Sequence, residues 1–451
     1  MTIIDPTEFR GAGPIHFPGD PDYDRAATPW NCAIVQTPVA VATPRSVEEV
    51  IDVVRAAVAA GLRIAPQSTG HGSDAVVGSD MDRAILLRMS EFSGVTIDPD
   101  LGTARILGGT LWQAVLDAAA PFGLTALHGS TGDVAVAGFI LGGGLSFYGR
   151  RHGLATSSVL SIDLVTAGGR LVHASPTSHS DLFWALLGGG GSFGVIVSIE
   201  IALLPIADVV AGMLLWDLAD APRVAHAWAQ WTRTVPDDST TTLRMMRFPP
   251  LPELPPFLSG RSLVVIDGAV LADDATAADR LAPLRELGPE IDTFGRIPSH
   301  QVTAVHMDPP DPTPTTVDHS LLSAFPEDAV DALLDIAGPG VDTPLMFAEI
   351  RHLGGALAEP ADAALPCLDA DYALIAVSAI PVPEAAGPGD AAVHAVVDAL
   401  ASWSTGAFFP NFHGRPEDTA ACFDQSSWDR LRRTRQVYDP AGIWVAGHAV
   451  K

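Results

Sequence analysis

One short segment of the sequence combines a histidine with the backbone freedom needed to hold a ligand closely. Residues 66–72 read Pro-Gln-Ser-Thr-Gly-His-Gly and follow a short apolar stretch, residues 62–65. Glycines on both sides of His71 allow a sharp turn, and successive N–H groups in such a turn can form a concave site for an anion such as a pyrophosphate. We interpret this segment as an anion-binding turn with His71 beside the bound group; an ordinary surface turn is the alternative.

Residues 188–194 contain two glycine patterns that occur in enzymes. Their glycines match the dinucleotide-binding pattern GxGxxG, and the same residues contain GxSxG with Ser192 as the nucleophile. Both motifs require a strand before the loop and a helix after it. Here a helix is predicted before the loop and a strand after it. This order argues against a Rossmann domain and leaves a serine hydrolase at Ser192 as the alternative from another class.

Charged side chains also lie on one predicted strand, residues 345–351. Phe347, Glu349 and Arg351 alternate onto one face of this strand. One acid and one base among apolar neighbours suit a sheet that faces a substrate, and a Glu–Arg ion pair on a solvated face fits equally well. The sequence has no HExxH motif and no cluster of Cys and His, so we expect no metal site.

The elements that position these residues fall into two groups. In the first group, a capping box at residues 46–49 predicts a helix, followed by strands at 62–65 and 84–88. Thr110 is expected to cap a second helix. Hairpins, a short helix and a strand are predicted at residues 94–109, 161–174, 180–187 and 195–203, with a glycine-punctuated run at 127–144.

After Pro205, strands alternate with amphipathic helices, which is typical of a sheet covered by helices on one side. One of these strands is predicted at residues 321–325, just before a helix. The tail carries one helix, and its aromatic and Asn content suggests a return to the first part. We predict domains at residues 1–207 and 208–407, with residues 408–451 returning to the first domain.

Composition narrows the class of partner. The chain has 451 residues and a formal net charge of −27, with 53 acidic against 26 basic residues. Nucleic acids and anionic membranes require basic patches, so neither is expected as a partner. Three dispersed cysteines, no signal peptide and no apolar run of membrane-spanning length favour a soluble cytoplasmic protein. The oligomeric state is not predicted.

Four segments occur together and in order: residues 66–72, 129–144 and 181–197, and Val437-Tyr-Asp-Pro440. As an ordered set they resemble the FAD-linked oxidases of the berberine-bridge-enzyme type, within the vanillyl-alcohol-oxidase superfamily, and especially the bacterial members that use a single histidine. The resemblance covers nearly the whole chain. It implies an α+β, two-domain FAD-binding fold in which an antiparallel substrate-domain sheet, covered by helices, roofs the flavin.

The resemblance also implies the cofactor and its site. His71 falls where the family attaches the 8α-methyl group of FAD, and the backbone of the turn would hold the pyrophosphate. No cysteine stands at Thr131 or its neighbours, where some members form a second bond through sulfur, and Gln67 replaces the usual arginine, which removes one positive charge. Ser192 stands where the family usually has Asn. The residues expected to bind FAD are Gln67, Ser68, Thr69, Gly70, His71, Gly72, Ser73, Gly129, Ser130, Thr131, Val134, Gly138, Gly142, Val197 and His448.

The expected activity is an oxidase that moves a hydride from a small-molecule alcohol, amine or activated C–H to FAD and then passes the electrons to O2, giving H2O2. Glu349 is the predicted base, with a pKa raised by burial, and Arg351 is predicted to position an anionic or carbonyl group. Asn411 and His448 are secondary candidates. An FAD dehydrogenase with another electron acceptor is the alternative within the class, and the hydrolase at Ser192 is the alternative outside it.

Overall fold

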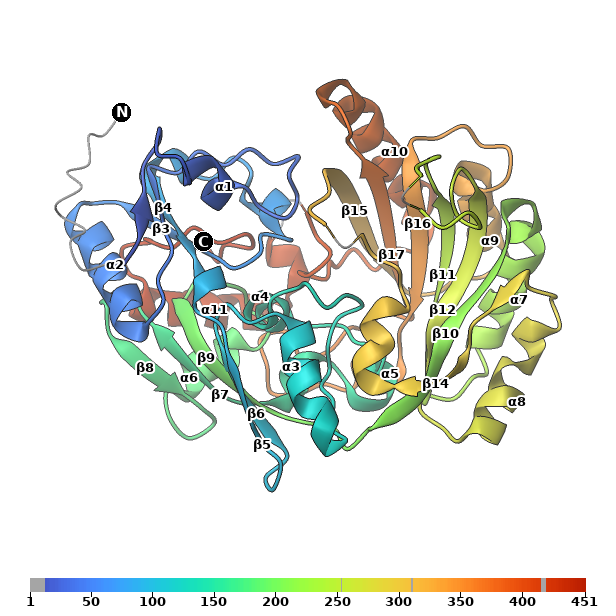
Figure 1. Cartoon of the computed structure of the whole chain (residues 1–451), viewed down its shortest axis with the longest axis horizontal. Coiled ribbons are helices and arrows are strands. Elements are labelled where there is room, and N and C mark those ends of the chain that lie inside the picture. Colours follow the sequence, from blue (N-terminus) through green and yellow to red (C-terminus); the bar gives the residue numbers. More distant parts are fainter. Residues whose placement is uncertain (1–12, 253, 310, 415–418) are drawn as a thin grey trace.

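The computed structural model describes residues 13–252, 254–309, 311–414 and 419–451. Its elements form two halves that lie side by side (Figure 1). The left half in that view contains two sheets built from residues up to 202, and the right half contains one large sheet with its helices. This arrangement is the predicted α+β architecture.

The first sheet positions the turn that carries His71. Strands β2 and β3 pair in parallel with β4, and β1 pairs antiparallel with β2. Ser46 caps α2 (Val47–Ala59) by accepting a hydrogen bond from the N–H of Glu49, as the capping box predicts, and the apolar face of α2 packs on this sheet. The strands are β1 (Ile15–His16), β2 (Ala40–Ala42), β4 (Ala84–Arg88) and β3 (Arg63–Gln67), in that order across the sheet.

The second sheet has five antiparallel strands and contains both predicted hairpins. The first hairpin is β5–β6 and the second is β7–β8, and β9 lies between them as a central strand. The order across the sheet is β5 (Val95–Asp98), β6 (Thr103–Leu107), β9 (Val195–Ala202), β7 (Val159–Val165) and β8 (Leu171–Ala174). The short helix α6 (Ser180–Leu186) leads through the glycine loop into β9, so the predicted order of helix, loop and strand is confirmed.

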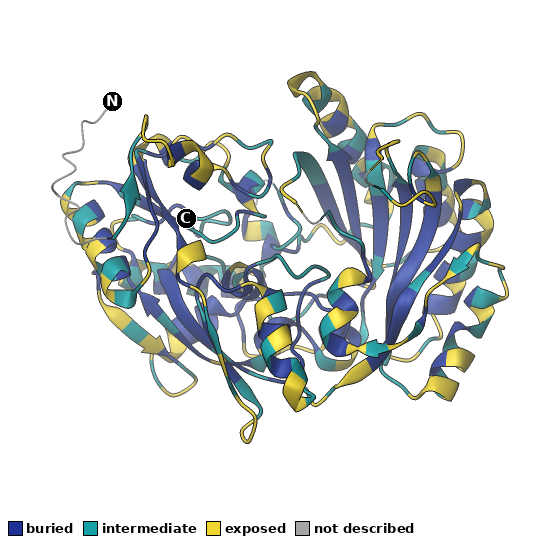
Figure 2. Ribbon diagram, in the orientation of Figure 1, coloured by how far each residue is buried: buried dark blue, intermediate teal, exposed yellow. Residues whose placement is uncertain are grey.

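The third sheet is fully antiparallel and fills the other half. Its order is β13 (Ile291–Asp292), β10 (Asp208–Asp217), β12 (Ser262–Val270), β11 (Ser239–Arg247), β16 (Leu345–His352), β17 (Tyr372–Ala379) and β15 (Thr315–Leu322), and β14 (Gly295–Pro298) also pairs with β10. Four helices pack on one face of this sheet: α7 (Ala221–Thr232), α8 (Asp274–Arg285), α9 (Glu327–Ala337) and α10 (Ala386–Ala399). In Figure 1 the first three lie on the side away from the other half, and α10 lies at the top of the sheet. Trp216 and Trp228 are fully buried between this sheet and its helices, and Figure 2 shows the strands as a continuous buried layer.

The remaining helices lie in the first half. They are α1 (Tyr23–Ala27), α3 (Trp112–Ala119), α4 (Val136–Leu141), α5 (Gly149–His152) and α11 (Gln425–Tyr438). Helix α11, near the end of the chain, packs beside α6, where Arg430 lies 4.0 Å from the ring centre of Trp184. Trp444 then forms a parallel bridge with Ile64 of β3, so the tail lies next to the strand that carries the turn. Within the described residues, no helix has both the length and the apolar character needed to cross a bilayer.

Two local predictions are wrong. Thr110 does not cap α3: Leu111 occupies the N-cap position, and the Thr110 hydroxyl instead bonds the backbone of Gly94 at 2.9 Å, which ties the start of α3 to β5. The strand predicted at residues 321–325 is β15, which begins at Thr315 and ends at Leu322. Its polar first half reads as loop in the sequence, yet pairing with β17 extends it.

Candidate active site

The turn after β3 needs glycine at position 70. Gly70 has a φ of +85°, and a Cβ atom there would lie 2.6 Å from the Cβ of Pro29. The backbone N–H of Trp30 donates to the carbonyl of Thr69 over 2.9 Å, so the preceding loop is fastened to the turn. The Ser68 hydroxyl donates to the carbonyl of Gly108. These contacts hold the turn against the end of β6.

The imidazole of His71 is held on three sides. The hydroxyl of Thr69 lies 2.8 Å from Nδ1, and the indole of Trp30 stacks on the ring with centroids 4.4 Å apart. On the other side, Nε2 lies 3.4 Å from Oδ2 of Asp133, which also accepts a hydrogen bond from the Trp30 indole N–H. Thr131 donates to the second oxygen of Asp133 over 2.7 Å. Thr131 and His71, both predicted cofactor residues, are therefore brought together through Asp133.

A buried arginine lies beneath the turn. Arg88, the last residue of β4, is 6% exposed and donates to the carbonyls of Ala26, Thr28 and Ser68 over 2.9–3.1 Å. Burial lowers its pKa to about 10, which leaves the guanidinium charged at neutral pH. Among the described residues no carboxylate pairs with it, although buried charges are normally paired. Arg88 thus provides a positive charge at a turn that lacks the family's usual arginine.

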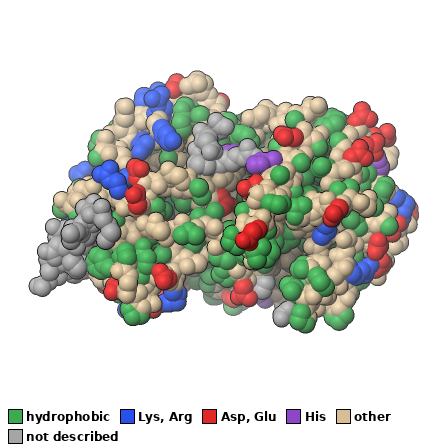
Figure 3. Space-filling view, turned by 90° about the horizontal axis from the view of Figure 1, so that it is seen from above, with side chains coloured by type: hydrophobic (Ala, Val, Ile, Leu, Met, Phe, Trp, Pro, Cys, Tyr) green, Lys and Arg blue, Asp and Glu red, His purple; other side chains and the backbone are tan. Residues whose placement is uncertain are grey.

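A cavity of about 690 Å³ lies beside Arg88 and the turn. Ser68 and Thr69 line one part of it, and its basic lining residues are His16, Arg25, Arg45 and Arg88. In Figure 3 the larger groups of basic side chains lie on the left half of the molecule, and smaller ones lie beside acidic side chains on the right half. An unpaired buried cation, a turn of backbone donors and a cavity of ligand size fit an anionic cofactor such as FAD.

The glycine run meets the tail through Asn411. The Asn411 side chain accepts from the N–H of Gly144 over 2.9 Å and donates to the carbonyl of Phe139 over 3.2 Å. A Cβ atom on Gly142 would lie 2.4 Å from the same amide. His448, further along the tail, donates through Nε2 to the carbonyl oxygen of Pro410 over 2.9 Å. Asn411 therefore connects α4 with the tail, and its amide is used in that contact.

The other predicted cofactor residues are more scattered. Gln67 ends β3 and Ser73 is 1% exposed at the start of the next turn; neither side-chain oxygen has a hydrogen-bond partner among the described residues. Val197 is buried in β9, where its carbonyl accepts from Gly108 next to Ser68. Gly72 and Gly138 have open space around the position of a Cβ atom, Gly129 packs on Phe139, and Val134 bonds through its carbonyl to Trp112.

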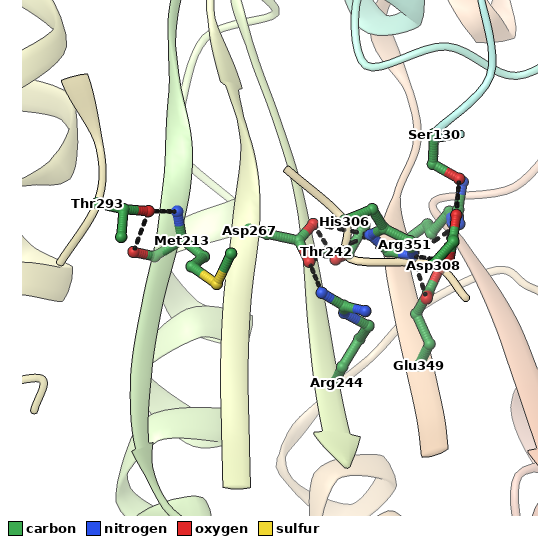
Figure 4. A network of polar contacts seen from close by, with 10 residues as sticks. All are labelled: Ser130, Met213, Thr242, Arg244, Asp267, Thr293, His306, Asp308, Glu349 and Arg351. Carbon is green, nitrogen blue, oxygen red and sulfur yellow. Dashed lines mark hydrogen bonds and ion pairs between the residues drawn. The ribbon is translucent and has the colours of Figure 1, made fainter. Parts of the chain in front are cut away.

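A network of charges lies on the face of the large sheet toward the first half (Figure 4). Asp267 on β12 pairs with Arg244 on β11, and Glu349 pairs with Arg351 on β16. His306, which follows the 3₁₀ helix Ser299–Ala304, lies between these two pairs. Asp267, Glu349 and His306 are each no more than 1% exposed. The guanidinium of Arg351 lies 5.0 Å from the ring centre of Phe412, so the tail borders this network.

His306 is an imidazolium in this network. Its Nδ1 lies 3.1 Å from Oδ2 of Asp267 and its Nε2 lies 3.0 Å from Oε2 of Glu349. A carboxylate accepts hydrogen bonds only, so both ring nitrogens must carry hydrogen. Burial and the charge of Arg244 lower the pKa of His306, but the nearby carboxylates of Asp267, Asp308 and Glu349 outweigh them and raise it to about 9.

The prediction of a raised pKa for Glu349 is wrong. Burial alone would raise it, but the charges of Arg351 and His306 hold the pKa of this carboxyl well below its usual range. Both oxygens of Glu349 are already engaged, one by Arg351 and the other by His306. A carboxylate so stabilised is a weak base. The sequence places Glu349 and Arg351 correctly on one face of the strand but does not show His306.

The charge on His306 predicts a pH dependence of stability. Its pKa is about 9 in the folded protein and about 6.5 unfolded, so the folded state holds the extra proton between these values. The free energy of unfolding should therefore be highest below about pH 6.5 and fall toward pH 9, with a slope of up to about 1.4 kcal/mol per pH unit. Urea unfolding across this range should show a flatter profile for His306→Gln, whereas the exposed control His226→Gln should keep the wild-type slope.

One hydrogen bond joins this network to the glycine run. The Ser130 hydroxyl donates to Oδ2 of Asp308 over 2.9 Å, and Oδ1 of Asp308 lies 3.9 Å from Nε2 of His306. Ser130 precedes Thr131, which reaches His71 through Asp133. The predicted cofactor turn and the predicted substrate-facing sheet therefore meet at Ser130 and Asp308.

The alternative centre at Ser192 lacks the neighbours of a nucleophile. Ser192 is 2% exposed, and its hydroxyl oxygen accepts a hydrogen bond from the backbone N–H of Val450 over 3.0 Å. No histidine among the described residues bonds to it, whereas a serine nucleophile needs a base in hydrogen-bond reach. This serine joins the glycine loop to the end of the chain.

Sequence reasoning missed four residues of this site: Arg88, Asp133, His306 and Asp308. An arginine at the end of an apolar parallel strand was a signal for Arg88, because such strands are buried. Asp133 stands in the glycine run that carries the resemblance. His306 and Asp308 come immediately before a Pro-rich loop and show no periodicity, so nothing local indicates that they reach the sheet.

Comparisons with known proteins agree with this geometry. Residues 38–175 match the FAD binding domain family. The (R)-6-hydroxynicotine oxidase of Paenarthrobacter nicotinovorans is 33% identical over 215 residues, which are 48% of this chain and 46% of that protein. The chain thus spans about half the length of the curated relatives it matches.

Solved structures match over nearly the whole chain. Wild-type Physcomitrella patens BBE-like 1 superposes with a TM-score of 0.84 at 19% identity, and the match covers 98% of both chains. Glucooligosaccharide oxidase from Acremonium strictum, described with a 6-S-cysteinyl, 8α-N1-histidyl FAD, gives a TM-score of 0.81 at 20% identity over 98% of both chains.

The chain therefore contains an FAD binding domain, matched at residues 38–175. Its fold is that of the berberine-bridge-enzyme-like enzymes, as the ordered motifs predict, and FAD is its cofactor.

Arg88 should contribute strongly to holding FAD. Hydrogen bonds to charged groups contribute about 1.5–3 kcal/mol, so Arg88→Met should weaken FAD binding about tenfold or more. The dissociation constant is best measured by fluorescence quenching in a His71→Ala background, where FAD exchanges freely. The exposed Arg83→Met, at the other end of the strand, is the matched control. Equal affinity for both variants would exclude a role of this charge in cofactor binding.

Proposed function

We propose that the protein is an FAD-dependent oxidase that moves a hydride from a small-molecule alcohol, amine or activated C–H to FAD, and then passes the electrons to O2 with formation of H2O2. One observation carries the proposal: the turn with His71 and the charged face of the large sheet meet through the Ser130–Asp308 hydrogen bond. Relatives named as nicotine and oligosaccharide oxidases support the activity.

We propose a covalent bond between His71 and the 8α position of FAD. The support is the position of His71 at the end of the FAD-binding turn, held by Thr69 and Trp30 with Asp133 beside Nε2. The Acremonium oxidase carries a histidyl and a cysteinyl bond to its flavin. With Thr131 near the place of that cysteine, this chain would form the histidyl bond alone.

We propose that the two halves of the molecule are an FAD-binding domain and a substrate domain. Residues 1–207 with 408–451 would form the FAD-binding domain, and residues 208–407 would form the substrate domain; the bounds of the three sheets and the Ile64–Trp444 bridge support this. Bound FAD would supply the hydride acceptor. Within the substrate domain, Arg351 would position an anionic or carbonyl group of the substrate. Glu349 would hold Arg351 and His306 in place, and Asn411 would keep the tail against the glycine run.

A visible spectrum and a peroxide assay test the proposal. Purified protein should show flavin absorbance bands, and a panel of alcohols, sugars, amines and phenols should contain compounds that give H2O2 under air. If a substrate reduces the flavin, and the reduced protein then passes its electrons to an added dye but not to oxygen, the protein is a dehydrogenase. A protein without flavin bands, labelled at Ser192 by a serine-directed reagent, would be the hydrolase instead.

The cytoplasmic location remains part of the proposal. Its support is the set of cysteines, Cys32, Cys367 and Cys422, all of which are free thiols. Fractionation of the producing cells is the direct test.

A further inference from the structure

We propose that Asp308 is the catalytic residue that accepts the proton of the substrate, for substrates that carry an O–H or N–H on the carbon that is oxidised. This inference rests on the proposed FAD oxidase function and names a residue that neither the motifs nor the relatives indicate. It assigns to Glu349 and His306 the role of positioning residues.

Asp308 is the open carboxylate of the network. Its side chain is 24% exposed, whereas the side chains of Glu349 and Asp267 are 1% and 0% exposed. Within the described residues its Oδ1 receives no hydrogen bond, because the Ser130 hydroxyl binds Oδ2 and His306 lies 3.9 Å away. In Figure 4 Asp308 lies beside Arg351 and between Ser130 and Glu349. Among Asp267, Asp308 and Glu349, only Asp308 therefore has a carboxylate oxygen that is free to accept a proton from a substrate.

Met307, the residue before Asp308, has a strained backbone conformation. Met307 has a φ of +55°, and among the described residues only His179 also combines a side chain with a positive φ. Such a conformation costs about 1–3 kcal/mol and persists where the surroundings impose it. The two carboxylates that bind His306 hold the residue before Met307, and the Ser130 hydrogen bond holds Asp308, the residue after it. The left-handed residue allows His306 to enter the buried network while Asp308 meets the first half.

The neighbours of Ser130 would bring Asp308 beside the flavin ring of bound FAD. Ser130 is next to Thr131, which reaches His71 through Asp133. His71 is the proposed attachment point for position 8 of the ring, and the cysteinyl bond of the Acremonium oxidase is at position 6. Position 6 is adjacent to N5, the atom that accepts a hydride. If FAD is bound in this way, the carboxylate that bonds to Ser130 would lie on the side of the ring that carries N5.

The proposed step balances in protons and electrons. The substrate carbon gives up a hydride, with two electrons, to the flavin, and its O–H or N–H gives the proton to Oδ1 of Asp308. A C=O or C=N bond forms in the substrate. Asp308 releases its proton to water, and O2 takes up the two electrons with two protons to give H2O2. A positioned base of this kind contributes about 10²–10⁴-fold to the rate.

The test compares Asp308→Asn with Asp311→Asn, an exposed aspartate three residues along the same loop. D-glucose, cellobiose, benzyl alcohol and 6-hydroxynicotine serve as probes for anaerobic reduction of the flavin. With any probe that reduces the wild type, Asp308→Asn should reduce the flavin at least about 100-fold more slowly, with little change in half-saturation. Asp308→Glu, which keeps the carboxylate, should recover much of the rate.

Sulfite titration gives a readout that needs no substrate. Sulfite is an anion that adds at N5, so removal of the Asp308 charge should tighten its binding about tenfold or more, the scale of one charge a few ångströms away. Asp311→Asn should bind sulfite as the wild type does. The flavin bands of each variant show that it is folded and loaded.

Two outcomes overturn the inference. One is an Asp308→Asn variant that binds sulfite and is reduced like the wild type. The other is an Asp308→Glu variant as slow as Asp308→Asn, which would assign Asp308 a structural role. A wild-type protein without FAD would instead refute the proposed function itself, so the two failures are distinguishable.

Discussion

Wild-type protein precipitated with acid should stay yellow, and His71→Ala should release all of its flavin into the supernatant. The reason is the proposed bond between His71 and the 8α position, which no other residue of the turn can form, since the turn contains a single imidazole. The bound flavin of the variant should remain detectable before denaturation, because Arg88, the turn and the cavity are unchanged. The measurement is the absorbance of pellet and supernatant, with fluorescence of the flavin band on a denaturing gel.

His173→Ala is the matched control for this experiment. His173 also lies 2.7 Å from an aspartate, Asp163, but on the exposed strand β8. It should keep a yellow pellet. A colourless wild-type pellet would refute the covalent bond while leaving FAD binding intact. A yellow His71→Ala pellet would mean that another nucleophile holds the flavin.

The parts of the site that sequence alone reveals are those with local signals. Of the two glycines that flank His71, Gly70 takes the left-handed conformation that the motif suggests, whereas Gly72 has a negative φ and open space around a Cβ atom. The alternation of Glu349 and Arg351 onto one face is a property of any strand. Hairpins and the capping box depend on neighbouring residues, and for that reason they are predictable.

The remaining features depend on residues far apart in the chain. Asp267, His306 and Glu349 come from three segments, and their pKa values follow from one another rather than from each residue's own neighbours in sequence. The low pKa of Glu349 arises because His306 and Arg351 converge on it. The sequence-based expectation considered burial alone and therefore had the wrong sign. Arg88 is a similar case, since its role depends on a turn about 20 residues earlier in the chain.

The second large effect is expected from Asp267→Ala. Asp267 is fully buried, and its carboxylate pairs with Arg244, accepts from Thr242 over 2.7 Å and binds His306. Without this carboxylate, the buried cations Arg244 and His306 lose the negative charge that they share. Loss of one partner from a buried pair costs about 3–5 kcal/mol in the free energy of unfolding. Urea unfolding followed by the fluorescence of the tryptophans behind this sheet measures the loss.

Asp292→Ala provides the contrast. Asp292 lies on β13 of the same sheet and pairs with Arg285 over 2.7 Å, but both side chains are 32% exposed. A surface pair contributes about 0–1 kcal/mol, so this variant should unfold nearly like the wild type. The double variant Asp267→Leu with Arg244→Met should recover part of the lost stability, because it leaves only His306 unbalanced. Equal stability of Asp267→Ala and Asp292→Ala would show that water reaches the charges around His306. It would also contradict the raised pKa of His306, which depends on these charges being buried.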